Sequence, residues 1–256
     1  MAHALLYSRQ IVYQQAHHMI TQKTASDQGP EDWRIICDFD GTITPFDVTD
    51  ALLQRFAHPS WEDVEEQWLG GKITARECMD RQVRLLNVPR HVLDGFLDTV
   101  PVVDGFVDFA HNCASQGISL TVVSDGLDYA IRRILSRHGV SAMPIIANRL
   151  RCLDESTYRL EFPYGIAGCA SGVCKCAVGK AMGGKILLIG DGHSDCCVAG
   201  VSALVLARQG KKLQQHCETD GYPHLIFADF HDVATCLEKI TRHAPAATTP
   251  AEARAA

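Results

Sequence analysis

Residues 34–44 read Arg-Ile-Ile-Cys-Asp-Phe-Asp-Gly-Thr-Ile-Thr, and the interpretation of the whole chain starts from this stretch. The apolar run 35–37 predicts a short buried strand that ends in a turn at Gly41. One residue separates Asp38 from Asp40, so both carboxylates project to the same side at the carboxyl end of the strand. Two like charges this close need a cation or a shared proton. The stretch therefore predicts a Mg²⁺ site or an acid/base pair, with a solvated turn as the alternative.

The composition is that of an ordinary globular protein. The chain has 256 residues, of which 46% are hydrophobic and 21% charged, enough for one α/β domain with a sizeable insertion. No apolar run approaches the roughly 20 residues of a membrane span. The net charge of −6 offers no basic surface for nucleic acid. We therefore expect neither a membrane nor a nucleic acid as partner, while a homodimer stays open.

The eleven cysteines are irregularly spaced, and the chain shows no signal peptide. This pattern favours reduced thiols and a cytoplasmic protein. The densest group is Cys169, Cys174 and Cys176, with Cys196 and Cys197 further on. Its spacing differs from the paired Cys-x2-Cys of structural zinc sites, so we interpret these residues as buried or incidental thiols, with zinc binding as the alternative.

Four short helices are predicted directly after the first strand, separated by breakers such as Gly70-Gly71 and Pro89. They cover residues 50–57, 61–69, 74–86 and 90–99. Thr74 and Glu77 have the spacing of a capping box at the start of the third. Four helices inserted at this point predict a small lid beside the sheet.

From Pro101 onward, predicted strands and helices alternate. The strands are 118–123, 144–147, 185–189, 203–207 and 225–227, with an irregular hairpin at 149–162. The helices are 104–116, 128–138, 175–182, 195–200, 210–219 and 231–242. This alternation predicts an α/β fold with a doubly wound parallel sheet.

The same pattern predicts the domain boundaries. Residues 33–46 and 101–243 form the core domain, and residues 47–100 form the helical lid. Residues 1–32 are interpreted as an N-terminal extension. Residues 244–256, rich in Ala, Thr and Pro, are expected to be a disordered tail.

Polar residues follow three of the predicted strands. Ser124-Asp125-Gly126 comes after the second strand, and Gly-Asp-Gly-His-Ser-Asp, with Asp191 and Asp195, comes after the strand 185–189. Each group alone is typical of a turn or a helix cap. Because the carboxyl ends of parallel strands share one edge, we expect both groups to meet Asp38 and Asp40 in one cleft.

Taken in order, these stretches resemble the four motifs of the haloacid dehalogenase-like (HAD) phosphohydrolases. Asp-Phe-Asp-Gly-Thr at 38–42 resembles the first motif, and Ser124 the second. Lys175, in Ser-Gly-Val-Cys-Lys, resembles the third, and Gly-Asp-Gly-His-Ser-Asp the fourth. The resemblance covers residues 33–242. It implies a Rossmann-like core, a Mg²⁺ cofactor and a small phosphomonoester substrate.

The resemblance also implies a role for each residue. Asp38 attacks phosphorus and forms an aspartyl-phosphate, while Asp40 protonates the leaving oxygen and then activates water. Ser124, with Asp125 and Gly126, binds the phosphoryl group, and Lys175 offsets its charge; Lys180 is the alternative lysine. The expected Mg²⁺ ligands are Asp38 and Asp191, the backbone carbonyl of Asp40, and Asp195 directly or through water.

The inserted helices resemble the C1-type cap of the phosphoserine phosphatase-like branch. Phosphoserine phosphatases carry a Glu nine residues after the nucleophile and a cap Arg for the substrate carboxylate; here those positions are Asp47 and Gln82. Without that arginine, the paired hydrogen bonds from a guanidinium to the substrate carboxylate cannot form. Phosphoserine is therefore a less favoured substrate.

The opening Cys-Asp-Phe-Asp-Gly-Thr-Ile-Thr and the segment Gly-Lys-Ile-Thr-Ala-Arg-Glu at 71–77 resemble another family. It comprises the 2-hydroxy-3-keto-5-methylthiopentenyl-1-phosphate phosphatases of methionine salvage. That family's fourth motif reads Gly-Asp-Ser-x-Thr-Asp, and this chain departs from it. The resemblance implies Asp47, Arg76 and Gln82 as substrate residues. The alternatives are a phosphoserine or phosphocholine-type phosphatase, a phosphotransferase, and a non-catalytic phosphate-binding regulator.

Overall fold

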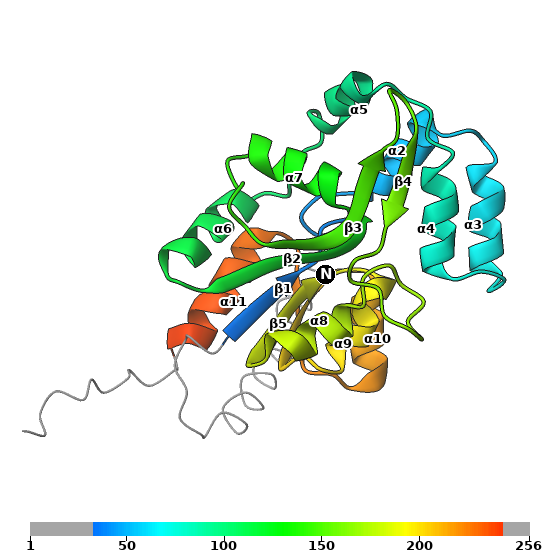
Figure 1. Ribbon diagram of the computed structural model, residues 1–256. Coiled ribbons are helices and arrows are strands. Elements are labelled where there is room, and N and C mark those ends of the chain that lie inside the picture. The colour runs from blue at the N-terminus through cyan, green and yellow to red at the C-terminus, as the bar shows by residue number, and fades with distance from the viewer. Residues whose placement is uncertain (1–32, 243–256) are drawn as a thin grey trace, which may run out of the picture.

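The computed structural model describes residues 33–242 (Figure 1). The predicted extension 1–32 and tail 244–256 lie outside the described residues. The predicted α/β fold is confirmed: a seven-stranded sheet has the order β4-β3-β2-β1-β5-β6-β7. Its strands are β1 (Trp33–Cys37), β2 (Ser119–Leu127), β3 (Ile145–Cys152), β4 (Tyr158–Glu161), β5 (Lys185–Gly190), β6 (Leu204–Arg208) and β7 (His224–Phe227).

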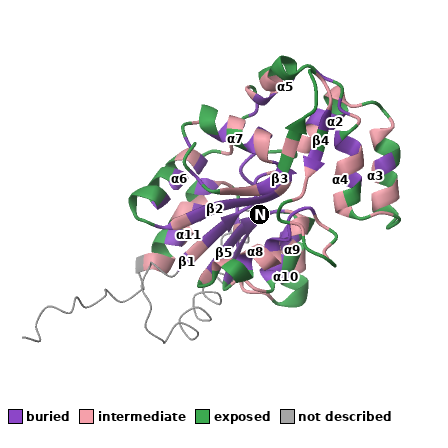
Figure 2. Cartoon of the chain, in the orientation of Figure 1, coloured by how far each residue is buried: buried purple, intermediate pink, exposed green. Residues whose placement is uncertain are grey.

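Helices cover both faces of this sheet, as in a doubly wound fold. Along β1, Ile35 and Cys37 pack on one face and Ile36 on the other, because side chains alternate along a strand. One face carries α6 (Phe106–Ser115), α7 (Asp128–Arg137) and α11 (Phe230–Arg242). The other carries α8 (Lys175–Met182), α9 (Cys196–Ala199) and α10 (Lys212–Asp220). Figure 2 shows the buried strands between the exposed outer sides of these helices.

One edge of the sheet departs from the all-parallel prediction. The segment expected to be an irregular hairpin is a regular antiparallel pair, with β3 and β4 in register from Arg149↔Glu161 to Cys152↔Tyr158. The connection between the two strands spans only residues 153–157, and so short a link permits only an antiparallel return. The sheet is therefore mixed at this edge and parallel elsewhere.

Strand β2 also runs further than predicted. The sequence placed a turn at Ser124, but the chain stays extended to Leu127, which pairs with Asn148 after a shift in register. The residues on either side of this irregular stretch, Val123 and Leu127, stay paired to β3. Ser124-Asp125-Gly126 therefore lies between them at the carboxyl end of the sheet.

The four predicted helices of the insertion are present, and we call them the inserted helices. They are α2 (Val48–Phe56), α3 (Trp61–Leu69), α4 (Ala75–Val83) and α5 (Arg90–Leu97). Helix α4 stops before Leu86, because Leu86 pairs with Ala57 in an isolated bridge. Thr74 caps α4 by accepting from the Glu77 N–H.

Figure 1 shows α2, α3 and α4 beyond one end of the sheet, next to β4. Within residues 33–242, every helix is too short or too polar to cross a membrane.

Candidate active site

The candidate site lies where three neighbouring strands end. Strand β1 sits between β2 and β5 in the sheet, so the residues that follow these strands meet at one edge. Asp38 follows β1, Ser124 lies in the last part of β2, and Asp191 follows β5. The structure thus brings together the groups that the sequence predicted to converge.

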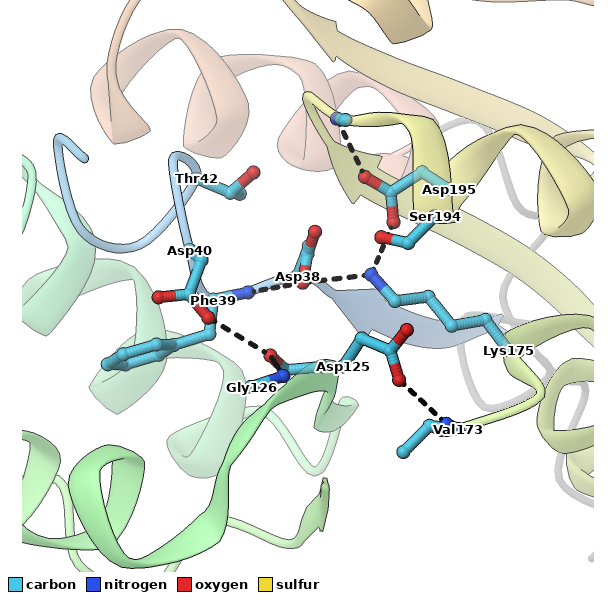
Figure 3. A network of polar contacts seen from close by, with 12 residues as sticks. Asp38, Phe39, Asp40, Thr42, Asp125, Gly126, Val173, Lys175, Ser194 and Asp195 are labelled. Carbon is cyan, nitrogen blue, oxygen red and sulfur yellow. Dashed lines mark hydrogen bonds and ion pairs between the residues drawn. The ribbon is translucent and has the colours of Figure 1, made fainter. Parts of the chain in front are cut away.

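Lys175 is the central cation of this site (Figure 3). Its side chain is 0% exposed, and its Nζ lies 2.8 Å from Asp38 Oδ1 and 2.7 Å from Asp195 Oδ1. Burial lowers the pKa of Lys175, but the charges of Asp195 and Asp38 outweigh that effect and raise it above its ordinary value. Lys180, the alternative lysine, is exposed further along α8. The geometry therefore favours Lys175.

Three carboxylates surround this lysine. Oxygens of Asp38, Asp191 and Asp195 all lie within 4.8 Å of one another. Asp195 is fixed by the N–H groups of Asp191 and Gly192, at 3.1 and 3.0 Å. Burial raises the pKa of both Asp38 and Asp191, and the charge of Asp195 raises it further. This oxygen-only donor set fits a hard divalent cation such as Mg²⁺, which would relieve the repulsion.

Asp40 lies apart from these three carboxylates. Its Oδ1 accepts the Val48 N–H at 2.8 Å, and its Oδ2 accepts from Ser124 Oγ at 3.4 Å. In Figure 3, Asp40 and Lys175 lie on opposite sides of Asp38. Burial raises the pKa of Asp40 well above its ordinary value, and the nearby charge of Asp47 adds to the effect. A raised pKa is the direction that a general acid requires.

The stretch Ser124-Asp125-Gly126 is held from several sides. Ser124 Oγ accepts the Gly126 N–H at 2.9 Å, and Asp125 Oδ1 accepts the Val173 N–H at 2.7 Å. A Cβ at position 126 would lie 2.4 Å from Asp40 Oδ2, so only glycine permits this approach. These contacts fix the backbone of this stretch directly beside Asp40.

A pocket of about 370 Å³ opens above these groups. Its floor contains the carboxylates of Asp38, Asp40 and Asp191. Its opposite wall comes from the inserted helices and the turn before them. That wall combines three apolar side chains with three acidic ones: Phe46, Trp68 and Met79, and Asp47, Asp50 and Glu65.

A family model of haloacid dehalogenase-like hydrolases matches residues 35–199, more than half of the chain. The chain belongs to the HAD hydrolase family. Proteins from Brevibacillus brevis and Bacillus velezensis are each 31% identical to it over 80% of its length, covering 95% and 90% of their own lengths. Both are named 2-hydroxy-3-keto-5-methylthiopentenyl-1-phosphate phosphatase. The predicted resemblance is confirmed, and the chain is a phosphatase.

Solved structures support the fold of this HAD phosphatase. A phospho-aspartyl intermediate analogue of phosphoserine phosphatase matches with a TM-score of 0.61 and 19% identity, over 80% of this chain and 98% of that one. A HAD family hydrolase from Salmonella enterica serovar Typhi matches with a TM-score of 0.64 and 17% identity, over 81% and 71%. At these identities the likeness establishes the shared fold.

The three predicted substrate residues of this HAD phosphatase lie in different surroundings. Asp47 lines the pocket and caps α2, where its Oδ1 accepts the Asp50 N–H. Gln82 also lines the pocket, is 4% exposed, and donates to Glu65 Oε2 at 2.7 Å. Arg76 is not among the pocket-lining residues, and its guanidinium binds backbone carbonyls of residues 166–171.

Several residues of the site were not singled out from the sequence. Thr42 donates to Asp191 Oδ1 at 3.2 Å. Asn148 donates to the Asp125 carbonyl, and Lys211 lies 3.9 Å from Asp191 Oδ2. Asn148 lies directly after the predicted strand 144–147, and Lys211 follows β6. The rule of polar residues after strands, applied to every strand, would have found Asn148, whereas Lys211 falls inside the predicted helix 210–219.

All eleven cysteines are free thiols. Cys174 and Cys176 flank Lys175, with their Sγ atoms 3.5 Å apart. Across residues 33–242, the set of three or more potential metal-ligating side chains that the fold brings together is Asp38, Asp191 and Asp195. The cysteine group therefore shows no zinc-like arrangement in the part of the chain that the structure describes.

Proposed function

We propose that this HAD phosphatase is a Mg²⁺-dependent phosphomonoesterase that works through an aspartyl-phosphate on Asp38. The observation that carries the proposal is the convergence of Asp38, Asp191 and Asp195 around Lys175, with Asp40 set apart on the other side. The free thiols support a cytoplasmic location. The inserted helices act as the cap, and residues 33–46 and 101–242 as the core.

In this mechanism Asp38 attacks phosphorus, and its bond to phosphorus forms as the ester bond to the leaving oxygen breaks. Asp40 gives its proton to that oxygen. Asp40 then takes a proton from water, which attacks phosphorus, releases phosphate and restores Asp38. Lys175 and the Ser124 hydroxyl stabilise the negative charge of the phosphoryl oxygens.

The metal belongs with the three converging carboxylates. Asp38, Asp191 and Asp195 would hold it, together with the Asp40 carbonyl. When bound, Mg²⁺ supplies positive charge that polarises the phosphoryl oxygen. Asp195 is already occupied by Lys175 and two N–H donors, which favours its contact with the metal through water.

We propose 2-hydroxy-3-keto-5-methylthiopentenyl 1-phosphate as the substrate, as the names of the two relatives suggest. Phe46, Trp68 and Met79 supply apolar surface for a methylthio group on the cap side of the pocket. Gln82 and Asp47 line the same wall and supply polar contacts. Arg76, which lies outside the lining, is not among the substrate contacts we propose.

The acidic wall disfavours phosphoserine and supports a second candidate. Asp47, Asp50 and Glu65 would repel a substrate carboxylate, and the described pocket-lining residues include no arginine to bind it. Burial and the charge of Asp47 together raise the pKa of Asp50 to about 6, and a cation bound nearby would offset the repulsion among these carboxylates. Beside Trp68, such a wall fits the quaternary ammonium of a phosphocholine-type ester.

A phosphate-release panel tests the proposal. It compares the methylthiopentenyl enol phosphate, phosphocholine, phosphoserine and p-nitrophenyl phosphate, each with Mg²⁺ and with a chelator. We expect turnover only with Mg²⁺ and the highest kcat/KM for the enol phosphate. Preference for phosphocholine would move the assignment to the second candidate. Transfer to an acceptor without phosphate release would indicate a phosphotransferase, and no turnover of any ester would indicate a regulator.

Replacing Asp40 by Asn is expected to lower kcat for alkyl phosphates by about 10²-fold or more, because the leaving oxygen loses its proton donor. For p-nitrophenyl phosphate, whose leaving group needs no proton, formation of the intermediate should be much less affected. The measurement is the burst of p-nitrophenol followed by its steady state. A loss in the burst rate for p-nitrophenyl phosphate as large as the loss in kcat for alkyl phosphates would contradict the role of Asp40 as the acid.

A further inference from the structure

Arg76 joins the inserted helices to the core through one loop. It lies in the first turn of α4, and its side chain reaches the loop of residues 162–174, which connects β4 to α8. We call this segment the 162–174 loop. It ends directly before Lys175, and its Ser171 lines the pocket.

The guanidinium binds a set of converging carbonyl oxygens. Nε donates to the Ser171 carbonyl at 3.0 Å, and Nη2 donates to the carbonyls of Ser171, Cys169 and Ile166 at 2.8, 3.0 and 3.2 Å. The backbone N–H of Arg76 lies in the first turn of α4, where N–H groups have no carbonyl partner within the helix, and it donates to the Ala170 carbonyl at 2.8 Å. Converging carbonyl dipoles repel one another unless a donor binds them, so the shape of the loop depends on Arg76.

The other side of the same loop is bound to the phosphate site. The Val173 N–H donates to Asp125 Oδ1 at 2.7 Å. At position 172 a Cβ would lie 2.4 Å from Asn148 Oδ1, and Asn148 itself holds the Asp125 carbonyl. The loop is thus fixed between Arg76 on the cap side and Asp125 on the core side, immediately before the buried ammonium of Lys175.

Close packing around Arg76 supports a specific fit. A Cβ at Gly165 would lie 2.9 Å from both Cζ and Nη2 of Arg76, so the loop backbone passes directly against the guanidinium. A lysine could donate to one or two of these carbonyls but could not span them with a planar fork.

We infer that Arg76 is a positioning residue: through the 162–174 loop it holds Lys175 and Asp125 in place for the phosphoryl group and ties the inserted helices to the core. This inference rests on the proposed function. It differs from a substrate contact because Arg76 acts on the phosphoryl end of every ester, whatever its leaving group.

The test compares Arg76→Ala, Arg76→Lys and Gly165→Ala with the control Arg84→Ala, whose exposed ion pair with Asp80 lies on the same helical segment. Hydrogen exchange at the Val173 and Cys174 amides reports the loop without any need for activity. Inhibition by orthovanadate, and kcat and KM for p-nitrophenyl phosphate and a larger ester, report the phosphate site.

We expect Arg76→Ala and Gly165→Ala to exchange faster at these amides, to bind vanadate at least about tenfold more weakly, and to lose kcat for both esters. Arg76→Lys should recover part of this loss, and Arg84→Ala should match the wild type. Unchanged exchange and vanadate binding in a folded Arg76→Ala would overturn the inference, as would a loss confined to KM for the larger ester. If the wild type itself releases no phosphate, the proposed function fails, and the exchange rates still decide whether Arg76 holds the loop.

Discussion

Replacing Asp38 by Asn is expected to lower kcat on the order of 10⁴-fold, because a neutral amide oxygen cannot take the place of the attacking carboxylate. The amide keeps the size of the side chain and an acceptor for the Phe39 N–H and Lys175 Nζ, both of which bind Asp38 Oδ1. The loss should therefore appear in kcat, with substrate binding largely kept. Phosphate release under Mg²⁺ is the measurement.

The same variant should be more stable than the wild type when no metal is present. Burial and the charge of Asp195 raise the pKa of Asp38 in the folded protein. The stability that protonated Asp38 contributes is therefore lost as the pH rises through this raised pKa. Removing the charge should raise the Tm at neutral pH in a chelator and reduce the gain in Tm from Mg²⁺. Asp63→Asn, an exposed position on α3, is the control. Full activity in Asp38→Asn would contradict the proposed role.

Replacing Lys175 by Met is expected to lower kcat by about 10³-fold, since it removes the cation beside the attacking carboxylate. The variant should also lose about 3 kcal/mol or more of unfolding free energy, because Asp38 and Asp195 would then be buried without their shared partner. Lys180→Met, exposed on the same helix, is the control and should change neither quantity. Kinetics with Mg²⁺ and urea unfolding in a chelator measure the two effects.

The stability loss in Lys175→Met should grow with pH. Without the ammonium, the pKa of Asp38 in the folded protein rises further above its value in the unfolded chain. The free energy of unfolding of the variant therefore falls more steeply as the pH increases between the unfolded and the folded pKa of Asp38. Lys175 stays charged in the wild type because its own pKa is raised. A stability difference that is constant between pH 5 and pH 8 would contradict the coupling between Lys175 and the two carboxylates.

Much of this fold follows from local pattern. The apolar runs at β1 and β5 predicted buried strands, and the order of strands and helices predicted a doubly wound sheet. The hairpin at 149–162 was predicted, but its second strand, β4, was not assigned to the sheet. Arg149, Arg151 and Arg159 give the two strands of this hairpin the polar sequence of a surface loop. Those arginines are instead half exposed around Glu161 on the sheet edge.

The convergence of Asp38, Ser124 and Asp191 was predictable because the carboxyl ends of parallel strands share an edge, whereas Lys175, which begins α8, was predicted only from the motif resemblance. The surroundings of Arg76 were not. Its partners are backbone carbonyls 90 to 95 residues away, which carry no side-chain signal in the sequence. The acidic wall of the pocket likewise depends on how the inserted helices lie over the sheet, so the roles proposed for cap residues rest on the structure.

The covalent step is the central claim, and acid-quenched enzyme tests it most directly. Wild-type enzyme is mixed with Mg²⁺ and p-nitrophenyl phosphate, whose leaving group needs no proton, stopped in acid within the first turnover, and digested for peptide mass spectrometry. We predict a phosphoryl group on Asp38, absent in Asp38→Asn and present at a higher level in Asp40→Asn, where hydrolysis of the intermediate is slowed. A phosphoryl group on another residue, or none while phosphate is released at the normal rate, would contradict the mechanism.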